Sequence, residues 1–146
     1  MILLFPWAKQ LRSGKNNPKN YPWWNEVVKL LKYDLVQCGV AGEKQIVPNF
    51  RQNLSVPQLC DLIKQCDTWI SVDSFAQHLC WDLGKKGVVL WGQSDPNIFG
   101  HPENINLLKG REYLREKQFW WWEQCDYKED AFVAPEIVAS VVNELM

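Results

Sequence analysis

Short apolar runs alternate along the chain with longer amphipathic stretches, and this alternation predicts an α/β fold. The first run, residues 2–5, is apolar at every position, which is typical of a strand covered on both faces of a parallel sheet. Further strands are predicted at 34–40, 45–47, 68–72, 87–91 and 104–108. Helices with apolar residues at helical spacing are predicted at 22–33, 53–66, 74–83 and 134–145.

Capping and terminating residues support the boundaries of these predicted helices. Ser55 and Gln58 have the spacing of a capping box, Pro57 lies in the first turn, and Pro135 stands at the start of the last helix. Gly84 is a suitable C-terminal cap for the helix before it. There is no internal repeat or linker. We therefore expect one Rossmann-like domain over residues 1–146, with a mostly parallel sheet and helices on both faces.

Composition narrows the classes of partner. The formal net charge is −1, from 16 basic and 17 acidic residues, so there is no broad basic field for a nucleic acid. The apolar runs are too short to span a membrane, and Pro6 interrupts the N-terminal one, which is predicted to be a strand rather than a signal peptide. The five cysteines lack Cys-x-x-Cys spacing, which argues against a zinc site or a disulfide framework and favours a reducing, cytoplasmic location.

Candidate chemistry lies where predicted strands end, the edge at which open α/β sheets bind ligands. A long polar loop rich in Lys and Asn follows the first strand, and loops of this length are usually functional or mobile. Asp73 ends another strand, and Ser74, Phe75 and Ala76 then offer the free amide groups of a helix start, which attract phosphate. Alternatively, Asp73 only caps that helix. No dinucleotide-binding glycine motif or Walker loop is present.

Two other features have less specific interpretations. His78 lies one turn into the helix, where a hydrogen-bonded core role is the more common one, and His101 lies in a loop. Residues 120–122 are three consecutive tryptophans. We favour a role for them in roofing the core or in a dimer contact, because adjacent residues cannot all face one ligand. Stacking on a base or a sugar ring is the alternative.

Several of these segments, in order, resemble the donor-binding, C-terminal half of glycosyltransferase family 9, the lipopolysaccharide heptosyltransferase-like enzymes. Residues 19–22 (KNYP) are similar to the family's Lys-x-Trp-Pro, and residues 37–43 (QCGVAGE) to its glycine-to-glutamate turn. Residues 72–78 (VDSFAQH) are similar to Val-Asp-Thr-Gly-x-x-His, and residues 92–96 (GQSDP) to Gly-x-Thr-Asp-Pro. The resemblance covers nearly the whole chain and implies one half of a GT-B glycosyltransferase.

The resemblance also implies roles around a nucleotide-diphosphate sugar such as ADP-heptose. Lys19 would neutralise the diphosphate or touch the sugar, and the amide groups of Ser74 and Phe75 would hold phosphate oxygens. Asp73 would contact sugar hydroxyls or the lysine, and His78 would lie at the donor. Phe75 stands where the family has a glycine, which would let the backbone approach phosphate closely.

The remaining matched positions complete the expected site. Gly39 and Glu43 would lie at the nucleoside, with Glu43 on the ribose, and Gln93, Ser94 and Asp95 would form the rim. No metal or other cofactor is expected, because no clustered set of Asp and His ligands is visible.

In this family the acceptor groove and catalytic base come mainly from the other half, and here Met1 directly precedes the first strand. We therefore expect a donor-binding module without its acceptor half, which becomes a transferase only with a partner chain or as a dimer. A stand-alone protein that sequesters a nucleotide or nucleotide-sugar is the first alternative. The second is a relic whose exposed face now mediates assembly.

Overall fold

The computed structural model describes residues 1–146 and contains one six-stranded sheet in which every pair of neighbouring strands is parallel. The strand order is β3-β2-β1-β4-β5-β6, and β1 and β4 are neighbours at the centre. This confirms the predicted Rossmann-like α/β fold, and it places the reversal of strand order between β1 and β4. The strands are β1 (Ile2–Phe5), β2 (Leu35–Gly39), β3 (Phe50–Gln52), β4 (Thr68–Val72), β5 (Val88–Trp91) and β6 (Ile105–Leu108).

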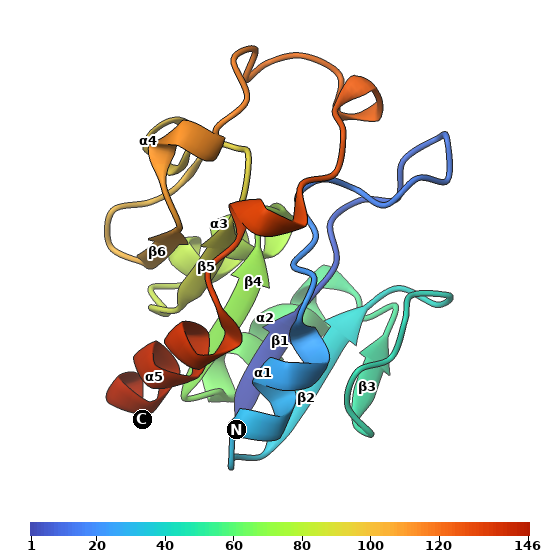
Figure 1. Cartoon of the computed structure of the whole chain (residues 1–146). Helices are drawn as coiled ribbons and strands as arrows, with labels where there is room; N and C mark the ends of the chain where they lie inside the picture. Colours follow the sequence, from blue (N-terminus) through green and yellow to red (C-terminus); the bar gives the residue numbers. More distant parts are fainter.

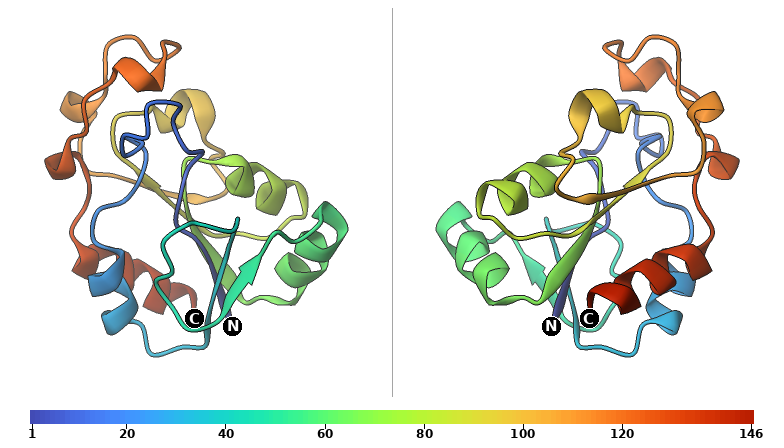
Figure 2. Two further views of the ribbon diagram at one scale, coloured as in Figure 1. Left: turned by 90° about the vertical axis from the view of Figure 1, so that its right-hand side faces the viewer. Right: turned by 90° about the vertical axis from the view of Figure 1, so that its left-hand side faces the viewer.

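The helices form a layer on each face of the sheet (Figure 1, Figure 2). Helices α1 and α5 pack together on one face, and α2 and α3 cover the other. None of the helices has the length and apolar character needed to cross a membrane. The helices are α1 (Trp24–Leu30), α2 (Val56–Gln65), α3 (Phe75–Asp82), α4 (Pro96–Phe99) and α5 (Pro135–Leu145), with short 3₁₀ turns at Arg111–Tyr113, Trp122–Gln124 and Glu129–Ala131.

The strands divide their side chains between two cores with the period of two that strand geometry dictates. Ile2 and Leu4 of β1 belong to the core under α1 and α5, whereas Leu3 and Phe5 belong to the core under α2 and α3. The same alternation holds in β5. Burial on both faces explains why these strands are continuous apolar runs in the sequence.

The third strand differs from its predicted position. Residues 45–47 form a loop, and the strand next to β2 is instead Phe50–Gln52. The cause is the buried side chain of Gln37, which accepts a hydrogen bond from Ile46 N (2.8 Å) and donates one to Lys44 O (3.0 Å). A side chain thus satisfies the backbone groups that a strand ladder would otherwise pair.

The predicted helix signals are present. Ser55 and Gln58 form the reciprocal capping box of α2. Gly84, just after α3, has φ 72°, a left-handed conformation that glycine adopts at low cost. The sequence rules for helix ends therefore hold for the start of α2 and for the end of α3.

We expect Gly87→Ala to lower the free energy of unfolding by roughly 1–3 kcal/mol, because a Cβ at this position would overlap the fully buried ring of Trp69. Urea denaturation measures the change. Gly110→Ala is the control, because its Cβ would meet only the carboxylate of the exposed Glu112, which can move away. Equal stability of Gly87→Ala and the parent protein would show that Trp69 repacks freely.

Candidate functional site

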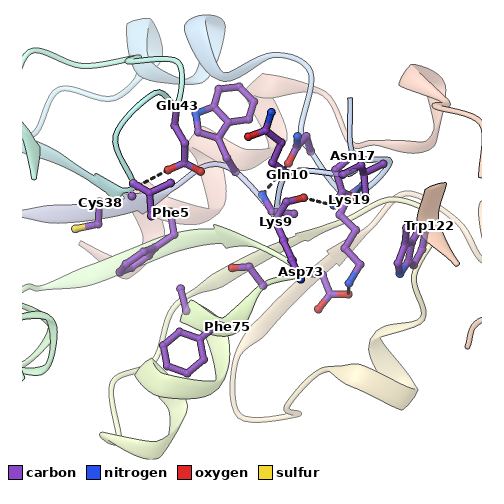
Figure 3. Close-up of a pocket in the computed structure, with 18 of the residues that line it drawn as sticks. Phe5, Lys9, Gln10, Asn17, Lys19, Cys38, Glu43, Asp73, Phe75 and Trp122 are labelled. Atoms are coloured by element: carbon purple, nitrogen blue, oxygen red, sulfur yellow. Dashed lines mark hydrogen bonds and ion pairs between the residues drawn. The ribbon is translucent and has the colours of Figure 1, made fainter. Parts of the chain in front are cut away.

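A cavity of about 1330 Å³ opens at the carboxyl ends of β1, β2 and β4, where the strand order reverses (Figure 3). The segments that line it include the polar loop after β1, the turn after β2, residues 51–59, the first turn of α3, and the tryptophan segment 120–122. The cavity therefore gathers three of the strand-end segments expected from the sequence. The predicted residues that line it are Lys19, Gly39, Glu43, Asp73, Ser74, Phe75 and His78.

An ion pair between Lys19 and Asp73 lies in this cavity, with 3.2 Å between the Lys19 Nζ and Asp73 Oδ2 atoms. Asp73 is almost completely buried, and its other oxygen accepts a hydrogen bond from Gln77 Nε2 at 2.9 Å. The pair connects the loop after β1 with the junction of β4 and α3. Figure 3 shows the lysine side chain extending across the cavity to the carboxylate.

The capping interpretation of Asp73 is wrong. The N-cap residue of α3 is Ser74, and no side chain caps this helix. The Ser74 hydroxyl instead lies 3.2 Å from the Ser71 hydroxyl. The amide groups of the first turn of α3 therefore remain without a side-chain acceptor at the edge of the cavity, which suits an anion.

Asparagine side chains hold the loop that presents Lys19. Asn17 Oδ1 accepts a hydrogen bond from Lys19 N (3.0 Å), and Asn17 Nδ2 donates to Lys9 O (2.8 Å). Asn20 Oδ1 accepts from Ala8 N at 2.8 Å. Hydrogen bonds within the loop after β1 therefore fix its conformation, and the Lys19 ammonium group has a defined position.

Phe75 does not block the start of α3. Its side chain is 63% exposed, and it lines the cavity from the helix. In Figure 3 it lies on the α3 side, and the lysine reaches Asp73 from the opposite side. The bulky residue in the glycine position therefore narrows the cavity edge without displacing the ion pair.

The turn after β2 places Glu43 at the other side of the cavity (Figure 3). Glu43 Oε1 accepts a hydrogen bond from Val40 N at 2.7 Å, and burial raises the pKa of this carboxyl. Gly39 is needed for this arrangement, because a Cβ there would overlap the Glu43 carboxylate. Cys38, beside them, stays a thiol because burial raises its pKa to about 12.

His78 is not a core residue, although a core role is the more common one for a lone histidine at such a position. It lies on the exposed side of α3 at the cavity edge, with its Nδ1 atom 2.7 Å from His101 Nε2. The ring of Trp81 stacks on His101 with 4.2 Å between centroids. Partial burial and the neighbouring His101 lower the pKa of His78.

None of the three residues expected at the rim lines the cavity, and two of them, Gln93 and Asp95, instead hold a neighbouring loop. Gln93 O accepts hydrogen bonds from Gln118 Nε2 (2.9 Å) and Arg115 N (3.1 Å), and Asp95 N donates to Gln118 Oε1 (2.9 Å). Asp95 also forms an ion pair with Arg111 at 2.8 Å, and this partner lowers the pKa of Asp95. Ser94 is buried beside them.

The core-roofing role favoured for the tryptophan segment is wrong, because the segment lines the cavity and belongs to neither core. Trp120 and Trp121 are 51% and 62% exposed. The ring of Trp122 lies 5.1 Å from Lys19 Nζ and 3.3 Å from the centre of the Arg115 guanidinium group. The exposed rings are compatible with the stacking alternative, and a dimer contact stays a prediction. The unusual run of aromatic residues was the only signal for stacking.

No group of three or more His, Cys, Asp or Glu side chains is arranged to hold a metal ion. What the cavity offers is one placed cation, a helix start with free amide groups, a half-buried carboxyl group and several indole rings. Such a set suits a ligand with phosphate, hydroxyl and ring components.

The fold is that of a Rossmann-type α/β domain with a cavity at its strand ends. Residues 34–114 match the sequence model of glycosyltransferase family 9 (heptosyltransferase), which is more than half of the chain. The chain therefore belongs to this family. No curated protein sequence matches it.

Solved structures share the fold at low sequence identity. ADP-heptose lipopolysaccharide heptosyltransferase II of E. coli superposes with a TM-score of 0.65 at 18% identity, over 99% of this chain and 45% of that one. The dodecameric iron-containing heptosyltransferase TibC, in complex with ADP-D-β-D-heptose, gives 0.70 at 15% identity, over 99% and 44%. A family 9 glycosyl transferase of Veillonella parvula gives 0.70 at 19%, over 99% and 45%. This chain spans less than half the length of each.

We expect the pH dependence of stability to change in His78→Gln. The folded pKa of His78 lies below 6.5, so on acidification below that value the unfolded chain takes up the proton first. The parent protein should therefore lose stability as pH falls from about 7 to about 5, and His78→Gln should lose less over this range. Urea denaturation at stepped pH measures the two slopes.

His101→Gln is the companion variant for this measurement. It removes the charge that repels protonated His78 but leaves the partial burial, so its slope should lie between those of the parent and His78→Gln. Parallel slopes for all three proteins would show that His78 titrates normally in the folded state.

Proposed function

We propose that residues 1–146 are a nucleotide-sugar-binding domain of a family 9 glycosyltransferase, and that its cavity binds a nucleotide-diphosphate sugar of the ADP-heptose type. The observation that carries this proposal is the Lys19–Asp73 pair beside the uncapped start of α3, inside a cavity with Glu43 on its far side. Family membership supports the class of ligand. TibC is described with ADP-D-β-D-heptose and another matching structure, E. coli heptosyltransferase WaaC, with ADP.

In this proposal each component of the cavity has one part of the donor to bind. The Lys19 ammonium group neutralises the diphosphate, and the amide groups of Phe75 and Ala76 at the start of α3 donate to its oxygens. Glu43, with one oxygen already engaged by Val40 N, accepts hydrogen bonds from the ribose hydroxyls with the other. Charge-assisted bonds of this kind are the strongest polar contacts available to a small site.

Transfer of the sugar needs more than these residues supply. A general base must lie within hydrogen-bond reach of the acceptor hydroxyl, and we assign the base and the acceptor groove to a second half. That half would belong to a longer form of the same protein, to a separate chain, or to a second copy. The role of the present domain is then to hold the donor diphosphate and to stabilise the negative charge that develops on it as the sugar leaves.

A thermal-shift screen tests the class of ligand. ADP and ADP-heptose should raise the melting temperature, because a ligand at 100 times its Kd adds about 2.7 kcal/mol to the stability of the native state. AMP should raise it less, because it lacks the second phosphate. UDP-, GDP- and CMP-sugars identify the preferred base. If no nucleoside diphosphate or nucleotide-sugar shifts the melting temperature, the proposed function is refuted.

We expect Lys19→Ala to weaken ADP binding by about 1.5–3 kcal/mol, the contribution of a hydrogen bond to a charged group, which is tenfold or more in Kd. Isothermal titration calorimetry measures the change. Lys32→Ala is the control, because Lys32 is an exposed lysine that does not line the cavity.

Lys19→Ala also leaves the buried Asp73 carboxylate without its counter-charge, so a loss of fold must be separated from a loss of contact. The double variant Lys19→Ala/Asp73→Asn removes both charges. It should regain thermal stability and still bind ADP weakly. Parent-like affinity in either variant would exclude Lys19 from the phosphate site.

A further inference from the structure

The side chain of Arg115 organises residues 115–124, which we call the aromatic loop. Its guanidinium group donates hydrogen bonds to the backbone carbonyls of Gln118 (3.0 Å) and Trp120 (2.6 Å) and stacks on the Trp122 ring at 3.3 Å. One cation thus binds the loop's own backbone on one side and an indole ring on the other. The loop is therefore ordered although it contains only one 3₁₀ turn.

The aromatic loop is also fixed to the sheet. Gln118 bonds to the backbone of Gln93 (2.9 Å) and of Asp95 (2.9 Å), directly beyond β5. Gln93 Nε2 donates to Asp126 O at 2.8 Å, just after the loop. The loop therefore has a defined position relative to the carboxyl edge of the sheet, where the cavity lies.

The loop presents two indole rings to the cavity and keeps a third for its own structure. Trp122 contacts Arg115 and Lys19, whereas Trp120 and Trp121 are more than half exposed and line the cavity. Phe119, immediately before them, is 80% exposed but does not line it. Large exposed aromatic surfaces at a cavity mouth usually mark a contact site.

The order of groups in the cavity indicates which part of a ligand would meet these rings. Glu43 and Trp122 lie on opposite sides of the Lys19–Asp73 pair (Figure 3). A nucleotide-sugar is a linear chain of base, ribose, diphosphate and sugar. If the ribose lies at Glu43 and the diphosphate at Lys19, as proposed above, the sugar continues from the Lys19–Asp73 pair toward the aromatic loop.

We propose that Trp120 and Trp121 form the subsite for the sugar ring of the donor. This inference rests on the proposed function of the cavity and adds its specificity for the transferred sugar. A pyranose ring has C–H groups on its face and hydroxyl groups at its edge. Its face can pack on the electron-rich face of an indole ring. Glu123, which also lines the cavity, offers a carboxylate to the edge hydroxyls.

The size of the cavity is consistent with this extended ligand. Pockets for single small molecules usually measure about 300–1,000 Å³. The cavity here measures about 1330 Å³, so it has room for a complete nucleotide-sugar.

The test compares the affinities for ADP and ADP-heptose in the full chain by calorimetry. In Trp120→Ala and Trp121→Ala we expect the preference for ADP-heptose over ADP to fall about fivefold or more, with ADP affinity unchanged within twofold. Trp121→Phe, which keeps a flat ring, should retain most of the preference. Trp121→Leu, which is apolar but not flat, should lose it. Phe119→Ala is the control and should leave both affinities unchanged.

Saturation-transfer NMR supplies a readout that a purely structural role would not affect. Irradiation of aromatic protons should saturate the C–H protons of the bound heptose in the parent protein, and Trp121→Ala should weaken this transfer while the adenine signal persists. Unchanged preference in the tryptophan variants, with ADP bound, overturns the sugar subsite alone. An equal loss for ADP and ADP-heptose places the base on the indoles and also overturns it. Absence of ADP and ADP-heptose binding in the parent refutes the proposed function together with this subsite.

Discussion

The ion pair between Lys19 and Asp73 is the constraint on which the cavity depends. Asp73 is only 5% exposed, and an unpaired carboxylate at such a depth would cost several kcal/mol. Lys19 supplies the counter-charge from a loop that asparagine side chains hold in place. The pair therefore draws the loop after β1 over the start of α3, and it does so at the point where the strand order reverses. The need to compensate one buried acid thus fixes the position of an ammonium group inside the cavity.

Much of this arrangement is encoded locally and could be predicted. Continuous apolar runs identify strands buried on two faces, and the carboxyl ends of parallel strands meet at one edge, so Lys19, Glu43 and Asp73 were expected together. The predictions that failed concern residues whose role depends on a side chain distant in the sequence. Gln37 satisfies the backbone around Ile46 and displaces the predicted third strand, and no pattern near residues 45–47 indicates this.

The aromatic loop shows more clearly that local sequence does not predict contacts with residues distant in the chain. Its position is set by Arg115 and by contacts to Gln93 and Asp95, which lie far away in the sequence and close in the fold. Three consecutive tryptophans indicate burial when only hydrophobicity is considered, because large apolar side chains are usually inside. Here the Arg115 guanidinium group holds the backbone of the aromatic loop, and in this arrangement the rings of Trp120 and Trp121 are exposed. The residues expected at the rim therefore act one step away, by holding the loop that reaches the cavity.

Trp122 connects the Lys19–Asp73 pair to the aromatic loop. Its ring lies near two cations, Arg115 at 3.3 Å and Lys19 at 5.1 Å. An aromatic ring stabilises a cation near its face without neutralising it. Asp73 and Trp122 therefore fix the position of the Lys19 ammonium group, and only Asp73 compensates its charge. Because the same ring also stabilises Arg115, a displacement of the loop would remove one of the two groups that position the lysine. The contacts of Trp122 and Arg115 thus place both Lys19 and the exposed rings of Trp120 and Trp121. The distance between the lysine and these rings is therefore set by the folded chain before any ligand binds.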